Sequence, residues 1–158
     1  MSSDERPVMV AYDGSAESRA AVHAAVTLFP GRRLIVVTVW ETGLAMAMAS
    51  ASSTALRSSG EGIAGEVAQL ERAEVAQTAR EGAELARGLG ATGEAIAVTE
   101  DLHAAVAVAS EADRRDPCVI VVGSRGLGRV KAPLLGSTSQ GLLRHTKRPV
   151  LVVQDRPA

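Results

Sequence analysis

Short apolar runs alternate along the chain with longer segments of mixed polarity. The runs occupy residues 8–12, 34–40, 95–98, 118–122 and 150–153, and apolar residues follow one another in each with almost no polar interruption. Such runs are typical of strands buried on both faces of a parallel sheet. The intervening segments predict helices over 15–29, over 61–87, from about residue 102, and over 137–145. Five strands alternating with four helices predict an open, doubly wound α/β sheet with helices on both faces, as one domain over residues 1–158.

The first strand–helix–strand unit carries its own start and stop signals. Asp13-Gly14-Ser15 interrupts the first apolar run, and Ser15 is a suitable N-cap for the helix that follows. Pro30-Gly31 ends this helix before the second run begins. A strand, a helix and a second strand in this order predict a right-handed parallel crossover.

Two stretches are predicted to lie outside regular structure. Residues 1–7 are polar and end on a proline, which predicts a disordered lead. Residues 43–60 are rich in Ala, Met and Ser and have no clear period, so we interpret them as a mobile loop or lid over the strand ends.

The two central helices carry less regular patterns. In the long helix, the apolar stripe of Ile63, Val67 and Leu70 later changes phase, which indicates a bend or a second buried contact. The helix near residue 102 has Asp101 or Thr99 as its expected cap.

The last third of the chain has a layout that suits a phosphate group. The fourth apolar run stops at Gly123, Gly126 follows, and Gly136 directly precedes Ser137 and Thr138, where a helix is predicted to begin. Glycines let main-chain N–H groups converge on an anion, and a helix N-terminus adds unpaired N–H groups and a positive dipole end. The alternative is ordinary turn and cap chemistry without a ligand, with Ser137 and Gln140 as a capping box.

The spacing Gly123-x2-Gly126-x9-Gly136-Ser resembles the nucleotide-binding signature of the universal stress protein family, specifically its ATP-binding branch. Asp13-Gly14-Ser15 and the segment Arg148–Val153 also resemble that family, so the likeness spans nearly the whole chain. It implies the strand order 3-2-1-4-5, in which Asp13 and Gly123 adjoin at the switch point where α/β folds bind ligands.

Several side chains are candidate ligand contacts. Asp13 is expected to accept hydrogen bonds from ribose hydroxyls, the alternative being an Asx turn to the N–H of Ser15. Arg125 and Lys131 are candidate phosphate partners, and the alternative for either is a solvated side chain, which explains Lys131 equally well.

The adenine position follows from the resemblance alone. It implies that the base lies near the backbone of Val39 and the apolar positions Ala11 and Val122.

Composition excludes other classes of function. The net charge of −1 argues against a nucleic-acid binder, which needs a clustered basic face. The single cysteine, Cys118, is expected to be a buried structural thiol, and the three histidines to be surface or helix-end residues, so we expect no protein metal site. No signal core or membrane span is evident, which predicts a soluble cytoplasmic protein. Ser124 lacks the sequence context of a nucleophile elbow, so no catalytic residue is assigned.

The sequence thus favours an ATP-binding regulatory protein of the stress response. Mg²⁺ would bridge the ATP phosphates, nucleotide occupancy would switch the loop or dimer conformation, and hydrolysis would be slow or absent. The resemblance implies a homodimer that pairs through the apolar edge strand Val150–Val153. The alternative function is a dimeric protein-interaction module that binds no nucleotide, and a nucleotidyl or phosphoryl transferase is a third. We expect Gly123→Val to abolish ATP binding with the fold intact.

Overall fold

The computed structural model describes residues 5–40, 60–99, 103–125 and 135–155, without the side chains of residues 60–64 and 67. The described residues form a five-stranded sheet in which all strands run parallel, in the order β3-β2-β1-β4-β5. The strands are β1 (Val8–Ala11), β2 (Arg33–Val39), β3 (Thr92–Val98), β4 (Val119–Gly123) and β5 (Val150–Val153). The predicted fold class and strand order are therefore confirmed.

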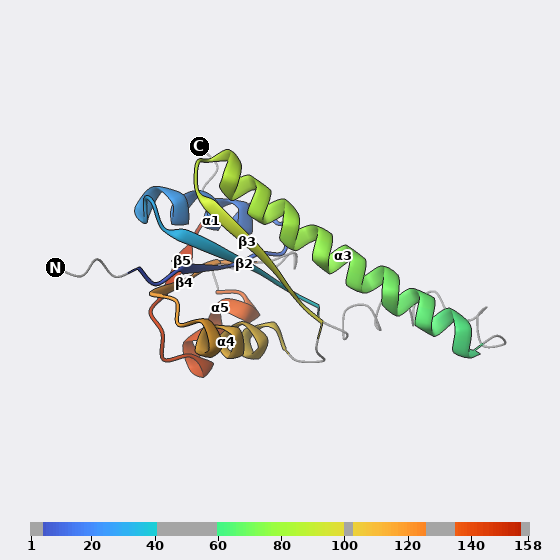
Figure 1. Cartoon of the computed structure of the whole chain (residues 1–158). Coiled ribbons are helices and arrows are strands. Elements are labelled where there is room, and N and C mark those ends of the chain that lie inside the picture. Colours follow the sequence, from blue (N-terminus) through green and yellow to red (C-terminus); the bar gives the residue numbers. More distant parts are fainter. Residues whose placement is uncertain (1–4, 41–59, 100–102, 126–134, 156–158) are drawn as a thin grey trace.

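Helices cover both faces of this sheet (Figure 1). Helices α1 (Ala16–Leu28) and α3 (Gly60–Gly88) lie on one face, and α4 (Ala104–Arg115) and α5 (Ser137–His145) on the other. Strand residues alternate between the faces, so Val8 and Val10 of β1 pack under α1 and α3, whereas Met9 and Ala11 pack under α4 and α5. Two buried layers result, which explains why the strand sequences are apolar at consecutive positions.

Small residues let the helices approach the sheet closely. Ala79, Ala83 and Ala86 of α3 are fully buried, and a Cβ on Gly82 would stand 2.7 Å from Val36 and 2.8 Å from Tyr12. Gly141 likewise lets α5 approach α4 closely, because a Cβ added at this residue would stand 2.4 Å from Ala105 Cβ. At this position the glycine serves the packing of two helices rather than of a helix on the sheet.

Helix α3 is longer than the sheet it covers. Figure 1 shows its N-terminal half extending beyond the strand ends. Burial of its described side chains begins at Val75, whereas Leu70 is 71% exposed. The phase change in the sequence therefore marks the point where α3 meets the sheet, and the exposed Leu70 shows no earlier buried contact.

Two predicted boundaries are wrong, the start of helix α4 and the end of the disordered lead. Helix α4 has His103 as its N-cap, with no side-chain cap bond, in place of Asp101 or Thr99. At the start of the chain, Pro7 is buried and its carbonyl accepts a hydrogen bond of 2.9 Å from the N–H of Cys118. The expected disordered lead therefore does not extend to residue 7.

The loop expected over 43–60 lies outside the described residues up to residue 59, and Gly60 begins α3. Within the described ranges, no helix is long and apolar enough to cross a membrane.

Candidate nucleotide site at the carboxyl ends of the strands

The carboxyl end of β1 leads into α1 through a tightly hydrogen-bonded turn. Asp13 Oδ1 accepts a bond of 3.0 Å from the N–H of Ser15, and Gly14 adopts φ 80°, a conformation that favours glycine. Ser15 is the N-cap of α1, and its Oγ accepts a bond of 3.1 Å from the N–H of Ser18. The Asx turn that we weighed as the alternative for Asp13 is therefore present. Asp13 itself is half-buried at the edge of the sheet where ligands are expected.

Gly123, the last residue of β4, is buried against the first turn of α1. A Cβ on it would stand 2.8 Å from Glu17 Cβ and 2.9 Å from the Glu17 carbonyl carbon. This glycine is therefore required by the packing of α1 on β4, because one of the two contacts is with the main chain. These contacts argue against our expectation that Gly123→Val leaves the fold intact, because the first turn of α1 would have to shift.

The start of α5 is tied directly to the end of β4. The N–H of Gly136 donates to the carbonyl of Ser124 at 2.6 Å, and the N–H of Ser124 donates to the carbonyl of Val153 at 2.7 Å. Ser124 thus joins the fourth strand, the fifth strand and the last helix through its backbone. Its side chain has no part in these bonds, so the sequence carried no signal for this junction. Residues 126–134, which include Gly126 and Lys131, lie outside the described part of the chain.

Helix α5 begins without a side-chain cap. Its N-cap is Gly136, with no side chain to accept the first N–H groups, and the N–H of Gln140 donates to the Gly136 carbonyl at 3.0 Å. The predicted capping box between Ser137 and Gln140 is therefore wrong. An α-helix offers no internal acceptor to its first N–H groups, here those of Ser137, Thr138 and Ser139. Together with the positive dipole end, these donors suit an anion.

The three apolar positions expected near the base lie on one face of the sheet. Ala11 and Val122 belong to the core under α4 and α5, and Val39 packs against the same core. They terminate or nearly terminate β1, β4 and β2, which are neighbours in the sheet. The structure therefore places them on the side from which α5 approaches. Arg125, at the end of the described segment after β4, is exposed.

The sequence also offered three histidines and a single cysteine as titratable side chains. His23, His103 and His145 are exposed, as expected, and Cys118 is half-buried where a buried thiol was expected. Among the described residues, no three His, Cys, Asp or Glu side chains form a group that could hold a metal ion. Tyr12 is buried, and this burial raises the pKa of its phenol above 10.0; Arg19 opposes the rise, and Glu81 and Asp13 add to it.

Comparison with known proteins decides the family. The model of the universal stress protein family matches residues 5–154. The chain belongs to the universal stress protein family. Among curated universal stress proteins, Rv2623 of Mycobacterium tuberculosis is 49% identical over 41 residues, which cover 26% of this chain and 14% of that protein. Mb2019 of Mycobacterium bovis is 37% identical over 67 residues, which cover 42% of this chain and 21% of that protein. These alignments cover only a small part of each relative.

Solved structures share the fold over almost the whole chain. The hypothetical protein MJ0577 superposes with a TM-score of 0.75 at 16% identity, covering 98% of this chain and 99% of its own. A universal stress protein solved in complex with cAMP gives 0.58 at 26% identity, covering 96% and 98%. One from Arabidopsis thaliana with AMP bound gives 0.61 at 19% identity, covering 96% and 92%.

Proposed function

We propose that this universal stress protein is a cytoplasmic regulatory protein that binds ATP, with nucleotide occupancy acting as a conformational or dimer switch and with hydrolysis slow or absent. One observation carries the proposal. Helix α5 has a glycine, Gly136, as its N-cap, so no side chain caps its first N–H groups. The N–H of Gly136 is hydrogen-bonded to Ser124, which holds this helix start at the end of β4 and beside the end of β1. A phosphate group at this place would meet donors from two elements at the topological switch point.

The residues divide by the part of the nucleotide they would meet. The backbone and hydroxyl groups of Ser137 and Thr138 would bind phosphate, with Arg125 as a charged partner. Asp13 would accept from the ribose, and the base would lie over the core that contains Ala11, Val39 and Val122. Gly126 and Gly136 would shape the phosphate loop, and Gly123 would set its distance from α1.

Mg²⁺ would be held by the phosphates of ATP rather than by a set of protein carboxylates. The adenine nucleotides bound in two solved universal stress proteins, AMP and cAMP, support the nucleotide class. Our proposal of a triphosphate with Mg²⁺ goes beyond the ligands of these two structures.

Calorimetric titration of the nucleotide-stripped protein with ATP and Mg²⁺, with AMP and GTP as controls, tests the binding. Two variants at one position test the site. Ser137→Asp places a carboxylate in the first turn of α5, where it stabilises the helix but repels phosphate. Ser137→Asn has nearly the same size without the charge. We expect ATP affinity to fall by about tenfold or more in the Asp variant, which is about 1.4 kcal/mol, and to be largely kept in the Asn variant. Equal affinities in the two variants would contradict phosphate binding at α5.

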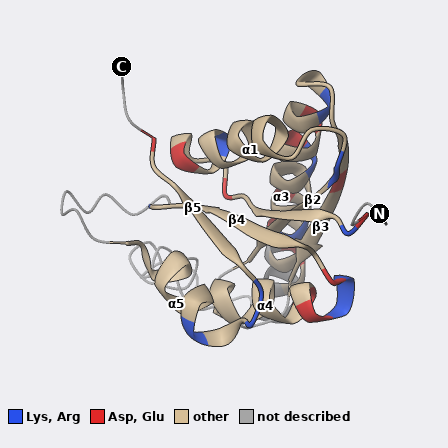
Figure 2. Ribbon diagram, turned by 90° about the vertical axis from the view of Figure 1, so that its left-hand side faces the viewer, with Lys and Arg blue, Asp and Glu red and all other residues tan. Residues whose placement is uncertain are grey.

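The sheet edge at β5 supports the proposed homodimer. All four residues of Val150–Val153 are half-buried in the single chain, and none of them is charged. Figure 2 shows α5 below β5 at this edge, and Leu143 of α5 is 55% exposed. An apolar edge strand, together with an exposed leucine on the helix below it, is what a second copy would cover.

Sedimentation of Val152→Lys tests the dimer. Ser124 donates to Val153 in the sheet, so the backbone groups of Val152 face away from β4 by alternation. A lysine at this position is expected to convert a dimer to a monomer, and a dimer that persists would contradict pairing through β5.

The alternative function, a dimeric interaction module that binds no nucleotide, has one observation in its favour. Asp13, our candidate ribose contact, already closes the turn before α1 through its Oδ1. Release of nucleotide from the freshly purified, denatured protein separates the two functions: recovered adenine nucleotide supports the first, and a nucleotide-free protein that does not bind ATP supports the second.

A further inference from the structure

Strand β3 lies at the edge of the sheet opposite β5, and within the described part of the chain it pairs with β2 alone. Trp40 donates its N–H to the carbonyl of Val98 at 2.9 Å, so Val98 faces β2. Backbone groups of a strand in a parallel sheet point to alternate sides at successive residues. Ile96 and Glu94 therefore also face β2, whereas Ala97, Ala95 and Gly93 point their N–H and C=O groups outward.

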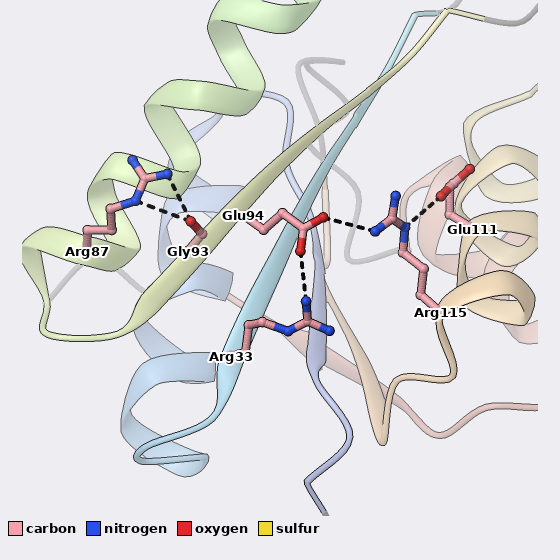
Figure 3. Close-up of polar contacts among 6 residues, drawn as sticks. All are labelled: Arg33, Arg87, Gly93, Glu94, Glu111 and Arg115. Atoms are coloured by element: carbon pink, nitrogen blue, oxygen red, sulfur yellow. Dashed lines mark hydrogen bonds and ion pairs between the residues drawn. The ribbon is translucent and has the colours of Figure 1, made fainter.

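One outward carbonyl is already covered. Arg87 of α3 donates from Nε and Nη2 to the carbonyl of Gly93, at 3.2 and 2.9 Å (Figure 3). In the described part of the chain, no such bond reaches Ala95 or Ala97 from outside the sheet. Their methyl side chains do not obstruct an approaching backbone. Among the described residues the edge is therefore unpaired at Ala95 and Ala97, two alternate residues, which is the spacing with which an added strand pairs.

A hollow of about 500 Å³ adjoins this open edge on the α4 side. Its lining comes from the end of β3 and the last turns of α4: Ile96, Ala97, Val98, Thr99, Glu111, Arg114 and Arg115. A strand added at Ala95 and Ala97 would direct every second side chain toward this hollow.

The charges at the hollow are held in place. Glu111 is only 8% exposed, and its two carboxylate oxygens bind Arg114 at 2.8 Å and Arg115 at 3.0 Å. Arg115 continues to Glu94 at 3.0 Å, and Glu94 also binds Arg33 at 3.0 Å (Figure 3). Such a network fixes the guanidinium groups before any partner arrives.

The paired side chains described at this edge carry more positive than negative charge. The network and Arg87 together comprise four arginines and two glutamates, an excess of two positive charges on a chain whose net charge is −1. The side chain of Arg114 remains 58% exposed at the rim. Acidic side chains complement this edge, whereas a second copy of the chain would bring two positive edges together.

We propose that the edge of β3 binds an extended acidic segment of a partner protein as an added strand, with a carboxylate side chain directed toward Arg114 and Arg115. The backbone of the segment would pair with Ala95 and Ala97. This surface is at the opposite edge of the sheet from β5, so a dimer formed through β5 leaves it accessible.

A synthetic peptide of alternating glutamate and valine, added to the full-length protein, tests the added strand. We expect saturable binding and slower hydrogen exchange at the Ala95 and Ala97 amides. Two N-methylated forms, one methylated at every glutamate and one at every valine, each remove the donors of a single peptide edge. We expect one form to lose affinity by about tenfold or more and the other to keep it. Equal effects of the two forms would overturn strand addition.

Two further measurements test the charge and the occupant. Arg114→Gln is expected to weaken the glutamate peptide by about three- to tenfold and to leave a threonine–valine peptide unaffected. Arg72→Gln, an exposed position earlier on α3, is the matched control and should change neither. Equal binding of a lysine–valine peptide would overturn the acidic partner. Protection of the Ala95 and Ala97 amides that grows with protein concentration, without peptide, would identify a second copy as the occupant and overturn the proposal.

Discussion

Replacement of Gly123 by alanine separates the packing role of this residue from the nucleotide site. The added Cβ would stand 2.8 Å from Glu17 Cβ, 2.9 Å from its carbonyl carbon and 3.0 Å from its carbonyl oxygen. Side-chain ends can rotate away from such a contact, but two of these atoms belong to the main chain of α1. The variant therefore folds only if the first turn of α1 moves away from β4.

The cost follows from the number and kind of these contacts. Overpacking of a well-packed core by one methyl group costs about 1 to 3 kcal/mol. For a chain of this size each kcal/mol lowers Tm by about 3 °C. We therefore expect Gly123→Ala to lose about 1 to 3 kcal/mol of unfolding free energy and about 3 to 9 °C in Tm.

Chemical denaturation followed by the fluorescence of Trp40, the single tryptophan, measures this loss. Gly65→Ala is the matched control, because a Cβ there meets no atom within 4 Å and the position is exposed on α3. That substitution is expected to stabilise by up to about 1 kcal/mol through helix propensity. A Gly123→Ala protein as stable as the parent would refute the packing argument. If Gly123→Ala is as stable as the parent but no longer binds ATP, Gly123 contacts the ligand directly.

Three further changes test the interior and the first turn. Thr38 is buried, and its Oγ1 has no hydrogen-bond partner among the described residues. Thr38→Val removes this hydroxyl, so we expect urea denaturation to show a stabilisation of about 1 kcal/mol. Destabilisation would indicate a hydrogen-bond partner outside the described residues. Burial raises the pKa of Tyr12 in the folded state, so its stabilising contribution is complete below pH 10.0 and is lost as pH rises toward the folded pKa. Tyr12→Phe should flatten this alkaline loss, and because the chain has one tyrosine, an unshifted tyrosinate absorbance titration of the parent would contradict the argument. Ser15→Ala should cost about 1 kcal/mol by removing the acceptor of the Ser18 N–H, whereas Ser15→Asp should keep the cap, and equal stabilities would exclude a capping role.

The elements of the fold were readable from local pattern. Consecutive apolar residues marked each strand within one or two residues, both in the buried central strands and in the half-buried β5, except that β3 begins at Thr92, earlier than predicted. Residues 92–94 were missed because Thr, Gly and Glu at a sheet edge carry no apolar signal. The order of the strands did not follow from pattern. It came from the resemblance, and the structure confirms it.

The errors at the candidate site share one physical cause. A capping box in the sequence at Ser137 is local, but the cap that forms is Gly136, because its N–H is bound to Ser124. Gly123 was assigned to a ligand because the sequence does not show that α1 packs against it. Both contacts join residues that are distant along the chain.

By itself the sequence determined the strands and helices, the apolar and small composition of the core, and the family signature that points to a nucleotide. These follow from side-chain chemistry and short-range periodicity, which are written in consecutive residues. The tertiary structure alone decided what surrounds each glycine, which carbonyl the start of α5 binds, and which backbone groups of β3 face outward at the arginine-lined hollow. Backbone contacts between distant segments depend on how the sheet is assembled, and they cannot be predicted from residue type because every residue except proline carries the same main-chain groups.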